Sequence, residues 1–218
     1  PDAGYGIRFG SWISSDKREP YNSWGNGSAM RVSPCAWVMD CGFYARTGCW
    51  PINGWNKVTC SAEVTHNHPE GIKGAQATAA AIFLCRFYAE GHAFDYSEPW
   101  TMDQLKANII KLLESNFDYD LSQSLAQIRP AYQFNESCQE TVPQAIIAFL
   151  ESNDFEDAIR NAISLGGDSD TLAAITGSIA EAAYGIPQWI KDKAWTYLDE
   201  PLRDVCSRWY RQLPQKNL

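Results

Sequence analysis

The amino-acid sequence predicts a mostly helical fold in a single domain. Several segments carry apolar residues at helical spacing, and residues 72–89 are almost wholly apolar or small, which is typical of a buried central helix. Alternating patterns that would indicate strands are nearly absent. The 218 residues are enough for one large domain with a substantial core, and no repeat or linker supports a second domain.

Helix starts and ends can be predicted along the chain in order. Residues 1–65 are rich in Gly, Trp, Tyr, Asn and Ser and predict loops around short helices. Residues 171–184 are rich in Ala and Gly and predict a helix that packs closely on its neighbours and ends at Gly185. Capping boxes, in which a Thr or Asn precedes a Gln or Glu by three residues, predict three further helix starts. These are Thr101 with Gln104, Thr141 with Gln144, and Asn153 with Glu156.

The composition narrows the classes of function. Lys and Arg total 18 against 26 Asp and Glu, so the net charge is −8 and the pI about 4.9. This balance argues against a protein that coats nucleic acid or an anionic membrane, and no segment approaches the ~20 apolar residues of a membrane span. A small phosphorylated ligand is compatible with the charge, because backbone amides and helix N-termini bind phosphate without net positive charge.

The seven cysteines and the lack of a signal peptide predict free thiols in a reducing cytoplasm. Four of them lie between residues 35 and 60 without a Cys-x-x-Cys pair, which argues against a structural zinc site. The sequence leaves the oligomeric state open.

Residues 165–171, Leu-Gly-Gly-Asp-Ser-Asp-Thr, lie between two predicted helices. Two carboxylates two residues apart, with a hydroxyl beside them, form a cluster of hard oxygen donors that suits Mg²⁺ or Mn²⁺ better than Zn²⁺. The two glycines allow the backbone to turn sharply and leave room above the carboxylates. The alternative interpretation is a glycine that ends one helix and an Asp or Thr that caps the next.

Residues 21–31, Tyr-Asn-Ser-Trp-Gly-Asn-Gly-Ser-Ala-Met-Arg, form a second candidate site. Consecutive backbone amides in a Gly-Asn-Gly turn can surround a phosphate, and Trp24 offers a flat face for a base. The same residues also make ordinary turns. A third segment, residues 65–71, holds His66 and His68, which could bind metal, transfer protons or donate to a phosphate, or could merely be solvated or cap a helix.

Together these motifs resemble the ADP-ribosylglycohydrolases, the relatives of the dinitrogenase-reductase-activating enzyme. The resemblance rests on residues 23–31, on Thr65 and His66 leading to Gly74, and on the Gly-Gly-Asp-Ser-Asp-Thr of residues 166–171, in family order across most of the chain. It implies an all-α orthogonal helical bundle with a central ligand cleft that holds two Mg²⁺ or Mn²⁺ ions.

By motif position, the resemblance also implies roles for individual residues. Asp168, Asp170 and Thr171 match metal ligands of the family, and His66 matches its phosphate- and ribose-contacting histidine. Trp24 stands where the family places an aromatic ring against adenine. The loop that wraps the diphosphate is matched by Ser23, Gly25, Asn26 and Gly27.

The chain also departs from the family pattern. Family members begin with a Gly-Asp-rich segment and a Thr-Asp-Asp motif, which supply further metal ligands and often a catalytic Glu. Nothing of that kind precedes Tyr5, and the sequence begins at Pro1 rather than at Met. The expectation is therefore one ADP-ribosylglycohydrolase-like domain over residues 1–218 that is N-terminally incomplete, with the general base missing from it.

Three functions are consistent with these observations. The first is a Mg²⁺-dependent hydrolase that cleaves the glycosidic bond between ADP-ribose and a modified side chain or small acceptor. The second is an ADP-ribose-binding module with impaired catalysis, and the third is a structural protein, since the family also includes lens crystallins. The acceptor could be arginine, serine, a nucleic-acid end or acetylated ADP-ribose, and the sequence does not choose among them.

Overall fold

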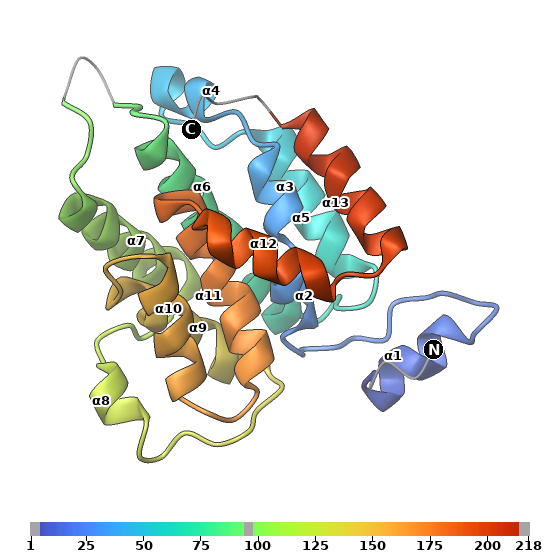
Figure 1. Ribbon diagram of the computed structural model, residues 1–218. Helices are drawn as coiled ribbons and strands as arrows, with labels where there is room; N and C mark the ends of the chain where they lie inside the picture. The colour runs from blue at the N-terminus through green and yellow to red at the C-terminus, as the bar shows by residue number, and fades with distance from the viewer. Residues whose placement is uncertain (1–4, 94–97, 214–218) are drawn as a thin grey trace. The chain divides into compact units, whose positions relative to one another are not determined.

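The computed structural model describes residues 5–93 and 98–213, and the regular structure within them is helical, without a strand. The prediction of an all-α fold is confirmed. The described residues up to Tyr184 form one compact unit, and those from Gly185 onward form another. Figure 1 labels the helices, which are α1 (Ile7–Ile13), α2 (Gly27–Met30), α3 (Ser33–Trp37), α4 (Cys41–Thr47), α5 (Ile52–Glu63), α6 (Pro69–Ala89), α7 (Met102–Phe117), α8 (Leu125–Ile128), α9 (Cys138–Leu150), α10 (Phe155–Ser164), α11 (Ser169–Tyr184), α12 (Gln188–Tyr197) and α13 (Glu200–Gln212).

The first unit is organised around α6, as the apolar run at residues 72–89 predicts. This helix packs against α2, α3, α5, α7, α9 and α11. Its middle, residues 77–87, is buried throughout, and Ile82, Phe83 and Phe87 are fully buried there. Small residues such as Ala75 and Ala79 let neighbouring helices approach closely. The N-terminal end of α6 lies against Ser23, at the start of the candidate site described below.

The helix caps show where local sequence signals are sufficient. The capping box of Thr101 and Gln104 starts α7 as predicted. Two predicted starts are wrong in position: α9 begins earlier, capped by Ser137, and α10 is capped by Asp154 rather than by Asn153. In both places a better cap lies nearby, since Asp154 accepts a 2.8 Å hydrogen bond from the backbone of Asp157.

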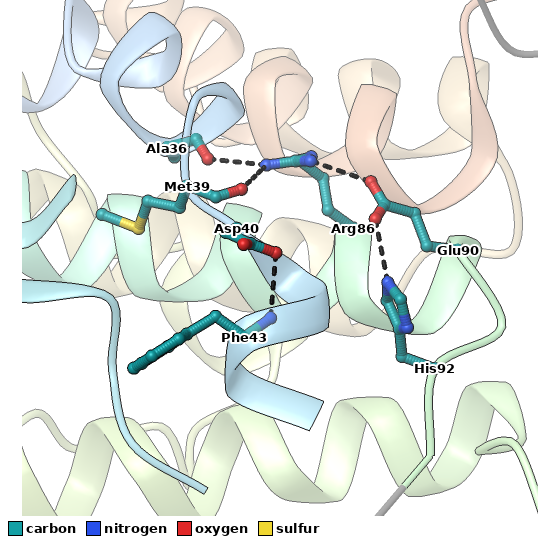
Figure 2. A network of polar contacts seen from close by, with 7 residues as sticks. All are labelled: Ala36, Met39, Asp40, Phe43, Arg86, Glu90 and His92. Carbon is teal, nitrogen blue, oxygen red and sulfur yellow. Dashed lines mark hydrogen bonds and ion pairs between the residues drawn. The ribbon is translucent and has the colours of Figure 1, made fainter. Parts of the chain in front are cut away.

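The far end of α6 is anchored by a charged network (Figure 2). Arg86 is buried and donates to the carbonyl oxygens of Ala36 at 2.9 Å and Met39 at 3.0 Å. Its other terminal nitrogen pairs with Glu90 at 2.8 Å, and the second carboxylate oxygen of Glu90 lies 3.1 Å from His92. The network ties α6 to the C-terminal end of α3.

The second unit contains α12 and α13. Asp199 caps α13 by accepting a 2.9 Å hydrogen bond from the backbone of Leu202. Of the helices in the described ranges, none is both long enough and apolar enough to cross a membrane.

Candidate functional site

The loop of residues 23–27 is held by main-chain hydrogen bonds to the segment that precedes α9. The backbone N–H of Asn26 donates to the carbonyl of Glu136 at 2.7 Å, and that of Cys138 donates to the carbonyl of Trp24 at 2.9 Å. A bridge between Gly25 and Ser137 completes the pairing. No sequence motif points to this partner segment, because the contact uses backbone atoms that any residue supplies.

The side chain of Asn26 joins two motifs that lie far apart in sequence. Its amide nitrogen donates to Oδ2 of Asp168 at 2.8 Å and to the hydroxyl of Thr141 at 3.2 Å. Asn26 and Asp168 are 142 residues apart, and both are buried. The Gly-Asn-Gly loop and the Gly-Gly-Asp-Ser-Asp-Thr motif therefore form one site.

The turn before α11 requires glycine. Gly166 and Gly167 have φ of 76° and 62°, in the left-handed region that favours glycine. A Cβ on Gly167 would also lie only 3.0 Å from the carbonyl oxygen of Gln133. The sharp turn that the glycine pair predicts is present, and Asp168 follows it directly and lies against Asn26 of the loop.

The three predicted metal ligands have different surroundings. Asp168 is buried beside Asn26, whereas Asp170 is exposed. Thr171 is buried, and its hydroxyl donates to Sδ of Met30 at 3.4 Å. Met30 ends α2, the short helix that follows the loop. Carboxylate and hydroxyl oxygens are the donors that Mg²⁺ and Mn²⁺ prefer, so the donor types fit such an ion. Within residues 5–93 and 98–213, however, no three His, Cys, Asp or Glu residues form a group that could hold a metal ion.

His66 lies against the loop and is held by a polar chain. Arg31 donates to the hydroxyl of Thr65 at 2.9 Å, and that hydroxyl lies 2.6 Å from Nδ1 of His66. Because a guanidinium can only donate, the Thr65 oxygen accepts from Arg31 and its proton is available to Nδ1. The network thus favours the tautomer that carries its proton on Nε2.

Burial, and after it the positive charges of Arg31 and Arg8, together lower the pKa of His66 from its ordinary value of 6.5 to about 4. The imidazole is therefore neutral near pH 7. A Cβ on Gly27 would lie 3.4 Å from Nε2, so the neutral N–H of His66 faces the loop backbone.

Trp24 presents an indole ring that is 48% exposed. The ring of His68 packs edge-on against it, with centroids 5.8 Å apart, while Nδ1 of His68 accepts from the backbone of Glu70 at 3.1 Å and caps α6. Sequence reasoning gave His68 no role in the site. In the structure it supports Trp24 and starts the central helix.

The structure thus brings most of the predicted site residues together. Five of them share the loop, namely Ser23, Trp24, Gly25, Asn26 and Gly27, with His66 beside it. Asp168 joins through Asn26, and Thr171 joins through Met30. Asp170 lies in the first turn of α11 and is exposed.

Comparison with known proteins gives a consistent result. The ADP-ribosylglycohydrolase family model matches residues 3–216. The chain is 28% identical to the ADP-ribosylarginine hydrolase Tri1 of Pseudomonas putida, over 88% of this chain and 47% of that protein. It is 26% identical to the mouse ADP-ribosylhydrolase ARH3, over 86% of this chain and 60% of the relative.

Two further comparisons concern length and fold. The ADP-ribosyl-[dinitrogen reductase] glycohydrolase of Rhodospirillum rubrum is 26% identical, over 74% of this chain and 47% of its own length. The chain therefore spans about half the length of the first curated relatives it matches. A solved structure titled ADP-ribosylglycohydrolase-related protein complex shares the fold, with a TM-score of 0.55 and 20% identity over 77% of this chain and 54% of that one.

Proposed function

Because this chain belongs to the ADP-ribosylglycohydrolase family, we propose that it takes part in hydrolysing the glycosidic bond between ADP-ribose and an acceptor. The acceptor would be a modified protein side chain or a small molecule. Relatives are named as hydrolases of ADP-ribosylated substrates, including ADP-ribosylarginine. Their names support the reaction class for this chain and leave the acceptor to experiment.

The observation that carries the proposal is the 2.8 Å hydrogen bond from Asn26 to Asp168. It joins a glycine-rich loop suited to a diphosphate with a pair of carboxylates suited to a hard cation. A nucleotide on the loop would then hold its distal sugar near the start of α11. This is the geometry that cleavage at the anomeric carbon requires.

Each part of the site has a distinct task in this proposal. The exposed face of Trp24 stacks on adenine, and the loop of residues 25–27 lies against the diphosphate. The Nε2 proton of neutral His66 donates to a phosphate or ribose oxygen. Asp168, Asp170 and Thr171 would hold Mg²⁺ or Mn²⁺, which when bound supplies charge that orients the sugar and polarises water. Asn26 fixes the carboxylate of Asp168 in place.

A second candidate is an ADP-ribose-binding module without turnover. It is favoured by the lack, within the described ranges, of a group of three His, Cys, Asp or Glu residues for a metal ion. Hard cations usually take about six oxygen ligands, which is more than Asp168, Asp170 and Thr171 supply.

Calorimetric titration with ADP-ribose, with and without Mg²⁺, tests the proposal together with an assay for released ADP-ribose. We expect Mg²⁺ to strengthen binding, and Asp168→Asn to remove that gain. We also expect Asp168→Asn to slow turnover about 100-fold or more, because a bound ion supplies several kcal/mol to the transition state. Asp154→Asn is the matched control, since Asn caps α10 as well as Asp does.

The outcomes separate the candidates. Turnover that depends on Mg²⁺ and on Asp168 supports the hydrolase. Binding of ADP-ribose without turnover supports the binding module. Failure of the unchanged chain to bind ADP-ribose rejects both and leaves a structural role on the same fold.

A further inference from the structure

Arg8 of α1 lies against the aromatic residues of the candidate site. Its guanidinium is 5.2 Å from the ring centroid of Tyr21 and 5.9 Å from that of Trp24. It also donates to the carbonyl oxygen of Tyr21. The guanidinium therefore lies over two aromatic rings of the candidate site, and no family motif in the sequence pointed to it.

The other arginine of the site has its donors engaged within the protein. Arg31 donates to the carbonyl of Ser61 at 2.9 Å and to the hydroxyl of Thr65 at 2.9 Å, with weaker contacts to Ala62 and Gly27. Arg8 is exposed, and the carbonyl of Tyr21 is its one hydrogen-bond acceptor among the described residues. Since a guanidinium carries five N–H donors, Arg8 keeps donors for a ligand.

A cation beside the loop favours an anionic ligand. The protein carries a net charge of −8, and the buried carboxylate of Asp168 lies under the loop. A diphosphate brings further negative charge to this place. Guanidinium groups bind phosphate oxygens in a bidentate manner, and these bonds are stronger than those of neutral donors.

We propose that Arg8 is a ligand-binding residue of this site, and that its guanidinium donates to the diphosphate of an ADP-ribose-type ligand. The inference rests on the proposed function and deepens it. Arg8 then makes the site selective for phosphorylated nucleotides over nucleosides, because an uncharged nucleoside gains nothing from the guanidinium.

The test compares Arg8→Gln and Arg8→Lys with the unchanged chain by calorimetric titration with ADP-ribose, adenosine and inorganic pyrophosphate. We expect Arg8→Gln to weaken ADP-ribose binding about tenfold to a hundredfold, the range for a hydrogen bond to a charged group. Binding of adenosine should not change. Arg8→Lys should recover part of the loss, since it restores the charge without the planar fork.

Arg18→Gln is the matched control. Arg18 is an exposed arginine of the same segment whose guanidinium lies 5.9 Å from the Trp12 ring centroid instead. The Arg18→Gln variant should bind all three ligands as the unchanged chain does. A similar loss in Arg18→Gln would mean that general charge explains the effect, and it would overturn the inference.

The remaining outcomes distinguish this inference from the proposed function. If Arg8→Gln binds ADP-ribose normally, or loses ADP-ribose and adenosine equally, Arg8 is not a diphosphate ligand, while the proposed function stands. If the unchanged chain does not bind ADP-ribose, the proposed function fails. The titration with pyrophosphate then tests the role of Arg8. Weaker pyrophosphate binding by Arg8→Gln than by the unchanged chain supports that role, and equal binding or no binding by either protein overturns it.

Discussion

The two ends of α6 hold their neighbours by different means. At the N-terminal end, backbone and side-chain atoms of other segments come so close that only glycine fits. A Cβ on Gly71 would lie 2.6 Å from the carbonyl oxygen of Ser23, and one on Gly74 would lie 2.4 Å from Sγ of Cys138. At the C-terminal end, Arg86 and Glu90 form a charged network with two carbonyl oxygens of the α3 region (Figure 2).

The difference bears on the proposed ligand site. Close backbone contact at the N-terminal end sets the loop of residues 23–27 beside His66 and leaves that histidine neutral. The network of Arg86 satisfies its charge mainly within the protein and fixes one helix to another. We therefore expect changes at the C-terminal end to alter stability alone, and changes at the N-terminal end to alter stability and ligand binding together.

The largest loss of stability should follow from Arg86→Met. Removing the guanidinium leaves the carbonyl oxygens of Ala36 and Met39 without their donor and leaves Glu90 without its arginine. Breaking a buried ion pair on one side costs about 3 kcal/mol or more of folding free energy. Urea unfolding followed by circular dichroism measures this loss, and ADP-ribose affinity measured well below the unfolding transition should not change.

The chain offers a matched control for this change. Arg160 and Glu156 on α10 form an ion pair with the same spacing of four residues, but the Arg160 side chain is 74% exposed. Arg160→Met should cost no more than about 0.5 kcal/mol, as is usual for exposed pairs on a helix. Equal losses for the two variants would contradict the view that burial gives the Arg86 network its strength.

A smaller loss of stability, with a clear loss of binding, should follow from Gly71→Ala. The new methyl group overlaps the carbonyl of Ser23 and lies 2.9 Å from Cβ of His66, so the loop must move. Overpacking of this kind costs about 1–3 kcal/mol. Calorimetry should show ADP-ribose affinity reduced about tenfold or more, which corresponds to about 1.4 kcal/mol of lost binding free energy.

Gly10→Ala provides the comparison, because a Cβ at Gly10 of α1 would meet nothing within 4 Å. Alanine at that position should leave stability unchanged or raise it slightly, since glycine disfavours helix interiors. If Gly71→Ala binds ADP-ribose as tightly as the unchanged chain, the close contact at this end of α6 does not shape the site.

Features of the fold that depend on residues close together in the sequence are predicted better than those that depend on distant residues. The capping box of Thr101 and Gln104 and the buried run of α6 are local, and both are predicted correctly. Where two caps compete within one or two residues, as at Asn153 and Asp154, local pattern does not decide between them. The start of α9 was placed too late because Ser137 and Glu140 were not considered as a cap.

The candidate site shows the same limit. Its residues were found only because several motifs together resemble a family, since each motif alone also fits an ordinary turn or cap. The bond between Asn26 and Asp168 spans 142 residues, and no local periodicity predicts such a contact. Arg8 and the backbone of residues 136–138 were missed for a related reason, because neither belongs to a motif.

A third expected effect concerns the neutral His66 and separates the two ends of α6 by pH. The folded state holds the pKa of His66 at about 4, below the ordinary value of 6.5, so the unfolded chain binds the proton more tightly. The contribution of neutral His66 to the free energy of unfolding is therefore fully present above pH 6.5 and is lost as the pH falls toward 4. The slope cannot exceed about 1.4 kcal/mol per pH unit, the limit for one proton.

Urea unfolding of the unchanged chain and of His66→Gln at several pH values between 7 and 4 measures this contribution. All other titratable groups are the same in both proteins, so the difference between the two curves isolates His66. We expect the free energy of unfolding to fall more steeply with decreasing pH in the unchanged chain, whatever constant offset the lost bond to Thr65 introduces. Parallel curves would mean that His66 is solvated and free to protonate. They would contradict the proposed role of His66 as a neutral hydrogen-bond donor at the loop. Arg86→Met, at the opposite end of the same helix, should lower the whole curve and leave this pH-dependent difference intact.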